Sequence, residues 1–486
     1  MPRFRLTVLA GLLLTASQVS ADDCDFYCYL GEANRASLVA LREANVLDDE
    51  LARTIADGID TVMANADADP SLRSSNYLDF EEQLIAVAGA EASQVHVGRS
   101  RQDLHGTVRR LLVRDAFLET FGQALVAREA VLTLAATYAD VVIPAYTHGV
   151  QAQPTSAGHY LLAFSAALER DAQRLREAFA RFNRSPLGAA ALGTSGYATD
   201  RERLATLLGF AGPVVNAYDA NLVSSSDFKL EFATVLSLSA IPVGQFAQNL
   251  HTQYHNVVPW FVLDASTTSG SSIMPQKRNP RPIDRLRTRS SQVIGQAQTL
   301  LLTSHNTNTG MHDYRVLAPT VELLASARDM YRRYGALLGS ISIDRERALA
   351  EVHRGYSTTT EIADALVRSH GLPFRQAHHF ASELTTWCLQ RGRALRSLTD
   401  EELREVYREA NGDALPVAIE IIRAAMDPRQ MVVNRRGLGG PQPAEVERML
   451  ATHRDETAAH AAWLEAVRQG LADAASELDR AFSDIR

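Results

Sequence analysis

The stretch Ser269-Gly-Ser-Ser-Ile-Met-Pro-Gln-Lys-Arg-Asn-Pro280 is the most informative part of this chain. Glycine and serine let a backbone approach a bound molecule closely and move. Lys277, Asn279 and the amides of a helix predicted to follow can hold an anion. We therefore predict a mobile loop that places Ser271 beside an anion clamp, a suitable position for proton transfer. As a generic Gly-Ser segment, the same residues would form only a turn between two helices.

Two other stretches carry side chains that can bind a carboxylate or transfer a proton. His96-Val-Gly-Arg-Ser-Arg-Gln-Asp103 places two arginines and a serine around a glycine, at the expected start of a long helix. Paired arginines bind carboxylates through two hydrogen bonds. Pro144-Ala-Tyr-Thr-His-Gly-Val-Gln-Ala-Gln-Pro154 is expected to place Thr147 and His148 in a loop between two long helices, and histidine is the usual proton carrier near neutral pH. Taken alone, each stretch also fits a structural turn.

Helical periodicity dominates the rest of the chain, which predicts an all-α fold with a core of long helices. Pro144 is expected to halt the first long helix of the core. Shorter helices are expected over 366–427, followed by a Gly/Pro loop and C-terminal helices. The length of the core helices suggests that more than one face is buried, hence oligomerisation. The predicted helices cover residues 32–66, 79–88, 156–182, 227–257, 284–304 and 316–338, and the first long core helix carries its apolar stripe between Leu111 and Leu132.

Composition and the N-terminus restrict the class of protein. An apolar content of 46% with 22% charged residues is typical of a soluble globular protein. Arg3 and Arg5 precede a short apolar run that ends in small residues near Ala21, which predicts a secretory signal peptide and a secreted or periplasmic protein. Loss of these two arginines would take the net charge from −8 to −10, so nucleic-acid binding is not expected. The apolar run is too short for a membrane span.

The three cysteines are Cys24, Cys28 and Cys388. Cys24 and Cys28 would lie just inside the mature N-terminus and could pair in an oxidising compartment. Cysteines and histidines with zinc-like spacing are absent from the sequence, so we expect no metal site.

Together, the three stretches resemble the active-site regions of the fumarase/aspartase superfamily, in the same order and at similar spacing. Their sequences are similar to those of the argininosuccinate lyase branch, which has His-Thr-Gly-Arg-Ser-Arg-Asn-Asp in the first region and Thr-His-Leu-Gln-x-Ala-Gln-Pro in the second. The resemblance runs from about Asn76 to beyond Gly440. It implies an all-α, three-domain lyase with a central long-helix bundle, forming a 20-helix core in a homotetramer whose active sites each draw on three subunits.

The resemblance also implies a reaction and its residues. Fumarate would be eliminated from an N-substituted aspartate without a cofactor, with Ser271 removing the Cβ proton. Lys277 and Asn279 would stabilise the carbanion. Thr147 and His148 would bind a carboxylate and help pass a proton to the leaving nitrogen. The remaining candidates are Asp284 as the acidic partner of His148, and Arg99, Ser100, Arg101, Gln102, Gln153, His305 and Asn306 as substrate-binding residues.

Several residues depart from the argininosuccinate lyase pattern. Argininosuccinate lyases resemble Tyr-Asn-Lys-Asp-x-Gln-Glu-Asp-Lys over 305–313, and use the Tyr, Gln and last Lys to hold the amino-acid half of the substrate. A direct alignment places His305, Gly310 and Asp313 at these positions. Smaller departures are Val97 and Gln102 for Thr and Asn, Gly149-Val150 for Leu-Gln, and Asp284 for Glu.

These departures predict a lyase with altered specificity for the amine, acting on an N-substituted aspartate other than argininosuccinate, such as an aminopolycarboxylate-like compound. Two alternatives stay open: a genuine argininosuccinate lyase, and a non-catalytic relative of the lens crystallins. The expected partners are a small dicarboxylate substrate and further copies of the chain. The predicted organisation is a signal peptide over 1–21, an N-terminal helical domain over 22–97, a central bundle over 98–355 and a C-terminal helical domain over 356–486.

Overall fold

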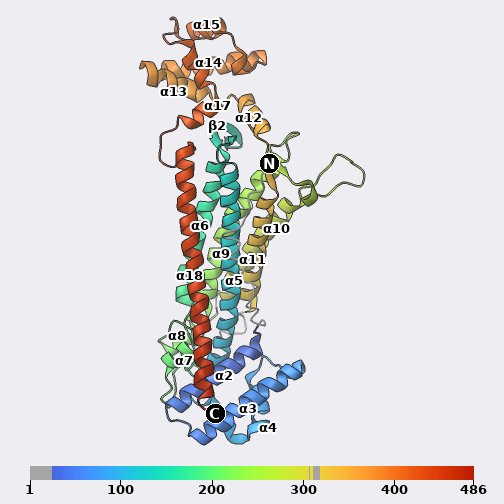
Figure 1. Cartoon of the computed structure of the whole chain (residues 1–486), viewed down its shortest axis with the longest axis vertical. Helices are drawn as coiled ribbons and strands as arrows, with labels where there is room; N and C mark the ends of the chain where they lie inside the picture. Colours follow the sequence, from blue (N-terminus) through green and yellow to red (C-terminus); the bar gives the residue numbers. More distant parts are fainter. Residues whose placement is uncertain (1–23, 306, 310–317) are drawn as a thin grey trace.

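The molecule is a long helical bundle with groups of shorter helices at both ends (Figure 1). The computed structural model describes residues 24–305, 307–309 and 318–486. The predicted signal peptide over 1–21 and the positions Asn306, Gly310 and Asp313 lie outside the described residues.

The central bundle contains α5 (Arg101–Thr137), α6 (Ala157–Phe182), α9 (Ser224–Gln253), α10 (Arg281–Ser304) and α11 (Ala318–Gly339). Helix α5 packs on α6 and α11, and α10 packs on α9 and α11. Their apolar faces share one core, in which the ring of Phe117 stacks on Phe179 at 5.0 Å and on Phe232 at 5.1 Å. The predicted all-α fold with long core helices is confirmed.

Helix α5 ends earlier than the sequence suggested. It starts with a capping box, in which the side chain of Ser100 accepts from the backbone and Asp103 bonds back to the N–H of Ser100. It ends at Thr137, well before Pro144, so the prediction that this proline halts the helix is wrong. Pro144 instead lies in a strand.

That strand belongs to a hairpin of β1 (Val142–Thr147) and β2 (Val150–Ser156), where a loop was predicted. His148 and Gly149 form the two-residue turn with φ values of 51° and 75°. Two consecutive positive φ angles define the turn that matches strand twist. The His-Gly pair lacks the usual Asn-Gly signal, so the hairpin was missed. A second short pair joins β3 (Phe261–Leu263) to β4 (Ile341–Ile343).

The N-terminal end of the bundle is covered by α2 (Phe26–Glu43), α3 (Asp49–Ala68) and α4 (Tyr77–Ala88). One helix was predicted over 32–66, and the structure has two. The chain turns at Asn45, whose φ is 55°, and Asp48 then caps α3 by accepting from the N–H of Leu51 at 2.8 Å. Helices α7 (Arg201–Leu207) and α8 (Ala217–Leu222) lie at the same end (Figure 1).

The opposite end carries short helices, as predicted for 366–427. They are α12 (Arg345–Arg354), α13 (Thr359–His370), α14 (Phe374–Arg391), α15 (Asp400–Asn411), α16 (Ile419–Ala425) and α17 (Pro428–Val433). A single helix, α18 (Pro443–Ser483), then runs back along the whole bundle and packs on α5, α6 and α2 (Figure 1).

Helix α9 is long and apolar enough to meet a length-and-composition test for a membrane span. Half of its most apolar window is buried inside the bundle, as expected for the core helix of a folded domain.

Candidate active site

The predicted site residues lie at two opposite ends of the bundle. The hairpin end contains the β1–β2 hairpin and the loop over 264–280, while the N-terminal end contains residues 96–103 and the end of α10. Helix α5 joins the ends with 37 residues, a length of about 55 Å at the α-helical rise. Asn279 and His305 flank the 24 residues of α10, about 36 Å of helix. One chain therefore does not assemble all the predicted residues into one site.

The loop over 264–280 projects from the side of the bundle and is closed at its base (Figure 1). Ser269 and Asn279 exchange two backbone hydrogen bonds of 3.1 and 2.7 Å. The Asn279 side chain also donates to the carbonyl of Gly270 at 3.2 Å. At the tip, Ile273 is 82% exposed. Asn279 thus fixes the base of the loop, while the tip is open to solvent or to another molecule.

Ser271 is half-buried near this tip, and its hydroxyl oxygen faces backbone donors. The oxygen accepts from the N–H of Met274 at 3.2 Å and of Ile273 at 3.4 Å. Donors aimed at an oxygen favour its ionised form. Ser271 is only partly buried, so its hydroxyl is also accessible to a ligand. Lys277 is exposed in the same loop.

Asp284 lies on the first turns of α10 and faces a histidine that the sequence analysis missed. One carboxylate oxygen lies 3.9 Å from Nε2 of His251, on the last turn of α9. The other ring nitrogen of His251, Nδ1, lies 2.8 Å from a guanidinium nitrogen of Arg287. His251 belongs to no motif, and only the packing of α9 on α10 brings it to Asp284. Pairing of Asp284 with His148 stays a prediction.

Thr147 and His148 form the exposed tip of the β1–β2 hairpin, with Gln153 exposed farther along β2. Gln151 anchors the hairpin to the C-terminal helices by donating to the carbonyl of Glu351 at 3.0 Å and to Ser357 Oγ at 2.6 Å. A side chain at Gly355 would collide with Gln151, because an added Cβ would lie 2.2 Å from its amide carbon. The hairpin therefore presents its tip on a rigid support.

Tyr146 connects the hairpin to the bundle. Its hydroxyl bonds to Glu351 and lies 3.4 Å from Gln253 Nε2 of α9. Burial, with the bond to Glu351, raises the pKa of Tyr146 to about 12, so it is a neutral donor at physiological pH. Thr147 and His148 of the hairpin, Ser271 and Lys277 of the loop, and Asp284 at the start of α10 accordingly lie toward one end of the bundle.

Arg99, at the N-terminal end, is buried and engaged with the protein. Its guanidinium donates to Ser37 Oγ at 2.6 Å and to Asn34, both on α2, and it stacks over the ring of Tyr77 at 5.3 Å. Its Nε also lies 3.3 Å from Nδ1 of His96. Burial and the nearby arginines lower the pKa of His96 to about 3. These contacts give Arg99 a structural role that the sequence did not reveal.

Arg101 is exposed at the start of α5, and Ser100 and Gln102 are half-buried beside it. Asp103 holds this turn against the loop over 188–199 by accepting from the N–H of Ala190 at 3.0 Å. Burial raises the pKa of Asp103, while its hydrogen bonds oppose that shift. Gly98 has a φ of 75°, and an added Cβ would lie 2.5 Å from Thr199 Oγ1, so the two segments fit closely only with glycine there.

His305 caps the far end of α10 and is exposed. Thr309 lies near α8, because its Oγ1 is 2.8 Å from the hydroxyl of Tyr218. His305 and Arg101 thus lie toward the same end of the bundle. Asn306 lies outside the described residues.

One grouping of possible metal ligands occurs in the described part of the chain: Cys24, Cys28 and Glu32. The two cysteines form a disulfide at the start of α2, with a Cα–Cα distance of 5.3 Å. Disulfide sulfurs are not thiolate ligands. The pairing considered from the sequence is therefore present, and this grouping does not support a metal site.

Comparison with known proteins identifies a lyase-family model described as "Lyase" over residues 25–295 and one described as "Argininosuccinate lyase C-terminal" over 356–433. Argininosuccinate lyase 2 of Agrobacterium fabrum is 33% identical over 93% of this chain and 91% of its own length. Argininosuccinate lyase of Methanoculleus marisnigri is 36% identical over 82% of this chain and 80% of its own.

Solved structures agree with these sequence relatives. EDDS lyase in complex with formate superposes with a TM-score of 0.87 and 31% identity, covering 95% of this chain and 92% of its own. A class II fumarase from Schistosoma mansoni shares the fold, with a TM-score of 0.66 at 16% identity over 89% of this chain and 97% of its own.

Proposed function

This chain belongs to the argininosuccinate lyase branch of the fumarase/aspartase superfamily and is a carbon–nitrogen lyase that releases fumarate, and from this premise we propose that its substrate is an N-substituted aspartate other than argininosuccinate. The fumarate-forming residues Ser271, Lys277, Asn279 and His148 match the family pattern. The residues expected to hold the amine half do not.

The stretch over 302–313 carries this proposal. His305, Gly310 and Asp313 stand where argininosuccinate lyases have the Tyr, Gln and Lys that hold the amino-acid half. A site built to hydrogen-bond one partner strongly rejects a ligand that leaves its polar groups unpaired. A structural neighbour with 31% identity is named EDDS lyase, so relatives at this distance include an enzyme named for another compound.

In the proposed mechanism, Ser271 takes the Cβ proton of the succinyl group. The electron pair left on Cβ delocalises into the adjacent carboxylate, and the C–N bond then breaks to give fumarate. A serine hydroxyl is a weak base, and the N–H groups of Met274 and Ile273 support its ionised form. Lys277 would supply positive charge to the intermediate, and His148 would help deliver a proton to the leaving nitrogen.

The site is proposed to form between copies of the chain in a homotetramer. Ser271, Lys277 and the hairpin lie at one end of a bundle whose other end carries Arg101 and His305. Antiparallel packing of two copies places unlike ends side by side. Five long helices from each of four copies would make the expected 20-helix core.

Export is proposed as well. The Cys24–Cys28 disulfide, just after the predicted cleavage site, supports an oxidising compartment.

The test follows fumarate by ultraviolet absorbance, using protein that starts at Asp22 and a panel of N-substituted aspartates that includes argininosuccinate. Fumarate from another member of the panel, with argininosuccinate inert, is the expected result. Ser271→Ala should reduce turnover by about a thousandfold or more because the base is lost, while Ser272→Ala serves as the matched control. Normal turnover of argininosuccinate would make the chain a genuine argininosuccinate lyase, and an active Ser271→Ala variant would disprove the assigned base.

The same variants test the shared site. Ser271→Ala and Arg101→Ala, each inactive alone, should recover about a quarter of the sites when mixed and reassembled in equal amounts, because each site draws the two residues from different copies. Failure of the mixture to recover activity, with tetramers containing both variants present, would contradict a shared site.

A further inference from the structure

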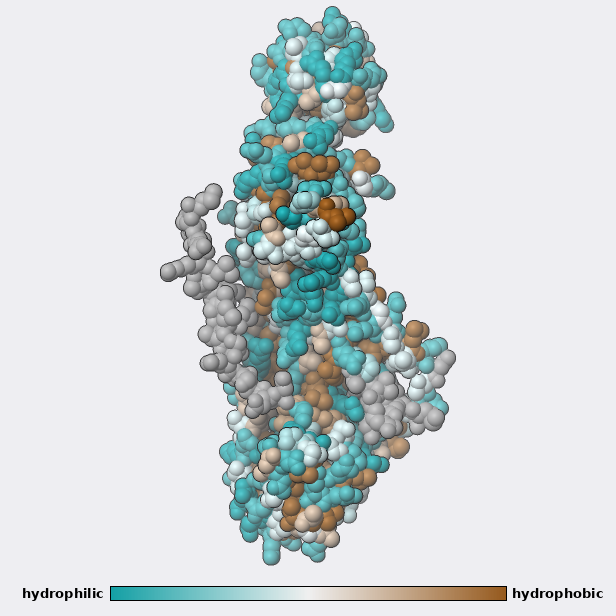
Figure 2. Space-filling model, turned by 90° about the vertical axis from the view of Figure 1, so that its right-hand side faces the viewer, coloured by the Kyte–Doolittle hydropathy of each residue, from teal (hydrophilic) through white to brown (hydrophobic). Residues whose placement is uncertain are grey.

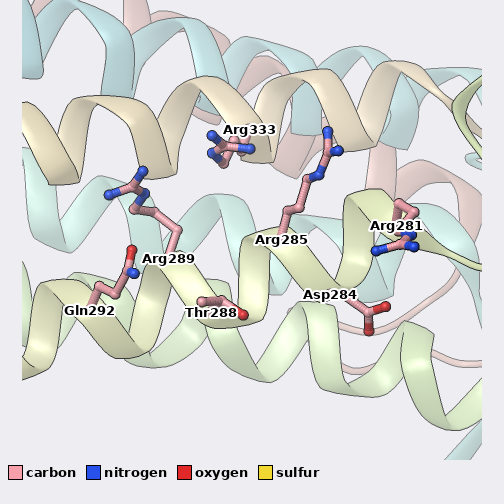
Figure 3. Close-up of a pocket in the computed structure, with 7 residues that line it drawn as sticks. All are labelled: Arg281, Asp284, Arg285, Thr288, Arg289, Gln292 and Arg333. Carbon is pink, nitrogen blue, oxygen red and sulfur yellow. The ribbon is translucent and has the colours of Figure 1, made fainter.

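A strongly basic groove of about 430 Å³ begins directly after the loop that carries Ser271. It lies along α10, with Arg281, Asp284, Arg285 and Arg289 on one side and Arg333 reaching in from α11 (Figure 3). Its volume lies within the range of pockets that bind small molecules.

Two of the four arginines are neutralised within the protein. Asp329 of α11 accepts from Arg289 Nε at 2.8 Å and from Arg333 Nε at 2.7 Å. Arg281 and Arg285 have no carboxylate partner in the described part of the chain. Arg281 Nε donates to the hydroxyl of Ser269 at 3.0 Å, and Arg285 has no hydrogen-bond or ion-pair partner among the residues that the structure describes.

The charge on α10 is confined to the end next to the loop. All charged residues of this helix lie between Arg281 and Arg289, and residues 290–304 contain none. Farther along the exposed face lie Gly295 and Leu302, small or apolar residues suited to packing against another copy. On the side of the molecule that carries α10, Figure 2 shows hydrophilic surface midway along the bundle and apolar surface below it. The basic end of α10 therefore differs in chemistry from the part of the helix that would pack against another copy of the chain.

The groove adjoins the loop that carries the predicted base. Arg281 bonds to Ser269, within two residues of the predicted base, and Arg285 follows one helical turn later, about 6 Å along the axis. Because the groove adjoins this loop, a nitrogen substituent on a succinyl group held there can reach it. Asp284, the acidic residue between them in sequence, lies 3.9 Å from His251.

We infer that Arg281 and Arg285 form the amine-side subsite and that the amine half of the substrate bears a carboxylate. This inference rests on the proposed function. A guanidinium matches a carboxylate through two parallel hydrogen bonds, and such planar recognition is the reason for arginine rather than lysine at these positions. A neutral amine substituent would leave Arg285 without an ionic partner, and a cationic substituent would be repelled by its positive charge.

The test compares two aspartates, one carrying a 2-carboxyethyl group on nitrogen and the other a 2-carbamoylethyl group. The groups are nearly equal in size, so the pair isolates the negative charge. The wild-type enzyme should prefer the carboxylate by roughly 10- to 100-fold in kcat/KM, the range for a charge-assisted hydrogen bond. Arg285→Gln should remove most of that preference by raising KM for the carboxylate, with kcat unchanged, and Arg285→Lys should restore part of it.

Arg404→Gln, at an exposed position on α15 in the distant C-terminal helices, is the matched control and should behave as wild type. Equal use of both compounds by the wild type, or an equal loss for both in Arg285→Gln, would overturn the inference. Dissociation of the Arg285→Gln oligomer in light scattering would also overturn it, because the arginines would then be subunit contacts.

Calorimetric binding of the same two compounds separates this inference from the proposed function. If neither compound yields fumarate but the carboxylate binds tighter and loses that advantage in Arg285→Gln, the subsite stands and the proposed reaction on these substrates fails. If binding shows no such difference, the subsite fails whether or not fumarate forms.

Discussion

Arg128 and Arg285 belong to the same helical bundle but lie in opposite environments. The side chain of Arg128 is 1% exposed and pairs with Glu169 of α6 and, at 2.6 Å, with Glu456 of α18. Arg285 is exposed in the groove of α10 and has no partner among the described residues. A buried charge must be paired, because losing water costs several kcal/mol per ion. An exposed charge has no such requirement and is available to a ligand.

The buried arginine is part of a network that holds α18 against the bundle. Glu169 accepts from Arg128 and lies 2.9 Å from His460 Nε2, and Ser165 Oγ lies 3.1 Å from His453 Nδ1. Burial opposes ionisation of Glu169, but the bond to His460 and the charge of Arg128 outweigh it and lower the pKa of Glu169. The network therefore fixes the position of a helix rather than providing chemistry.

The largest effect on stability is expected from Arg128→Met. This change leaves Glu169 and Glu456 without their cation and should lower the free energy of unfolding by about 3–5 kcal/mol. Urea denaturation measures the loss. Arg285→Met is the matched control and should stay within about 0.5 kcal/mol of wild type. Equal losses in the two variants would break the contrast between buried and exposed arginines.

A dependence on acid should follow from Glu169. Its folded pKa lies below its unfolded value, so its contribution is fully present above the unfolded pKa of about 4.5 and is lost as the pH falls through the folded pKa. Thermal melts of wild type and Glu169→Gln between neutral pH and pH 3 measure this contribution. The gap between the two proteins should narrow in acid, and a constant gap would show that ionisation of Glu169 adds nothing.

The smallest effect is expected from an exposed ion pair. Arg181 has a side chain 59% exposed and donates to Glu231, with its Nε at 2.9 and 3.1 Å from the two carboxylate oxygens. Glu231→Gln should cost at most about 1 kcal/mol, because both charges keep much of their hydration. The difference from wild type should shrink in high salt, where exposed charges are screened. A cost as large as that of Arg128→Met would show that burial does not set the value of these pairs.

The sequence predicted much of the fold because helices are encoded locally. The periodic apolar residues predicted most of the ends of the long core helices to within a few residues. These helices are α5, α6, α9, α10 and α11. The β1–β2 hairpin and the break at Asn45 were missed, because both depend on backbone angles that their residue types signal only weakly. The resemblance of the loop around Ser271 likewise predicted the lyase family, which the comparisons confirm.

The sequence by itself determined the helices and the residue types available for fumarate formation, since both are written in short, contiguous segments. Only the tertiary structure decided how these segments meet. It placed Ser271 and Arg101 at opposite ends of the bundle. It bonded the side chain of Arg99 to α2 and brought His251 close to Asp284. It also left Arg285 without a partner in an open groove. Such relations join residues far apart in the chain, so they follow from the packing of whole helices and not from local pattern.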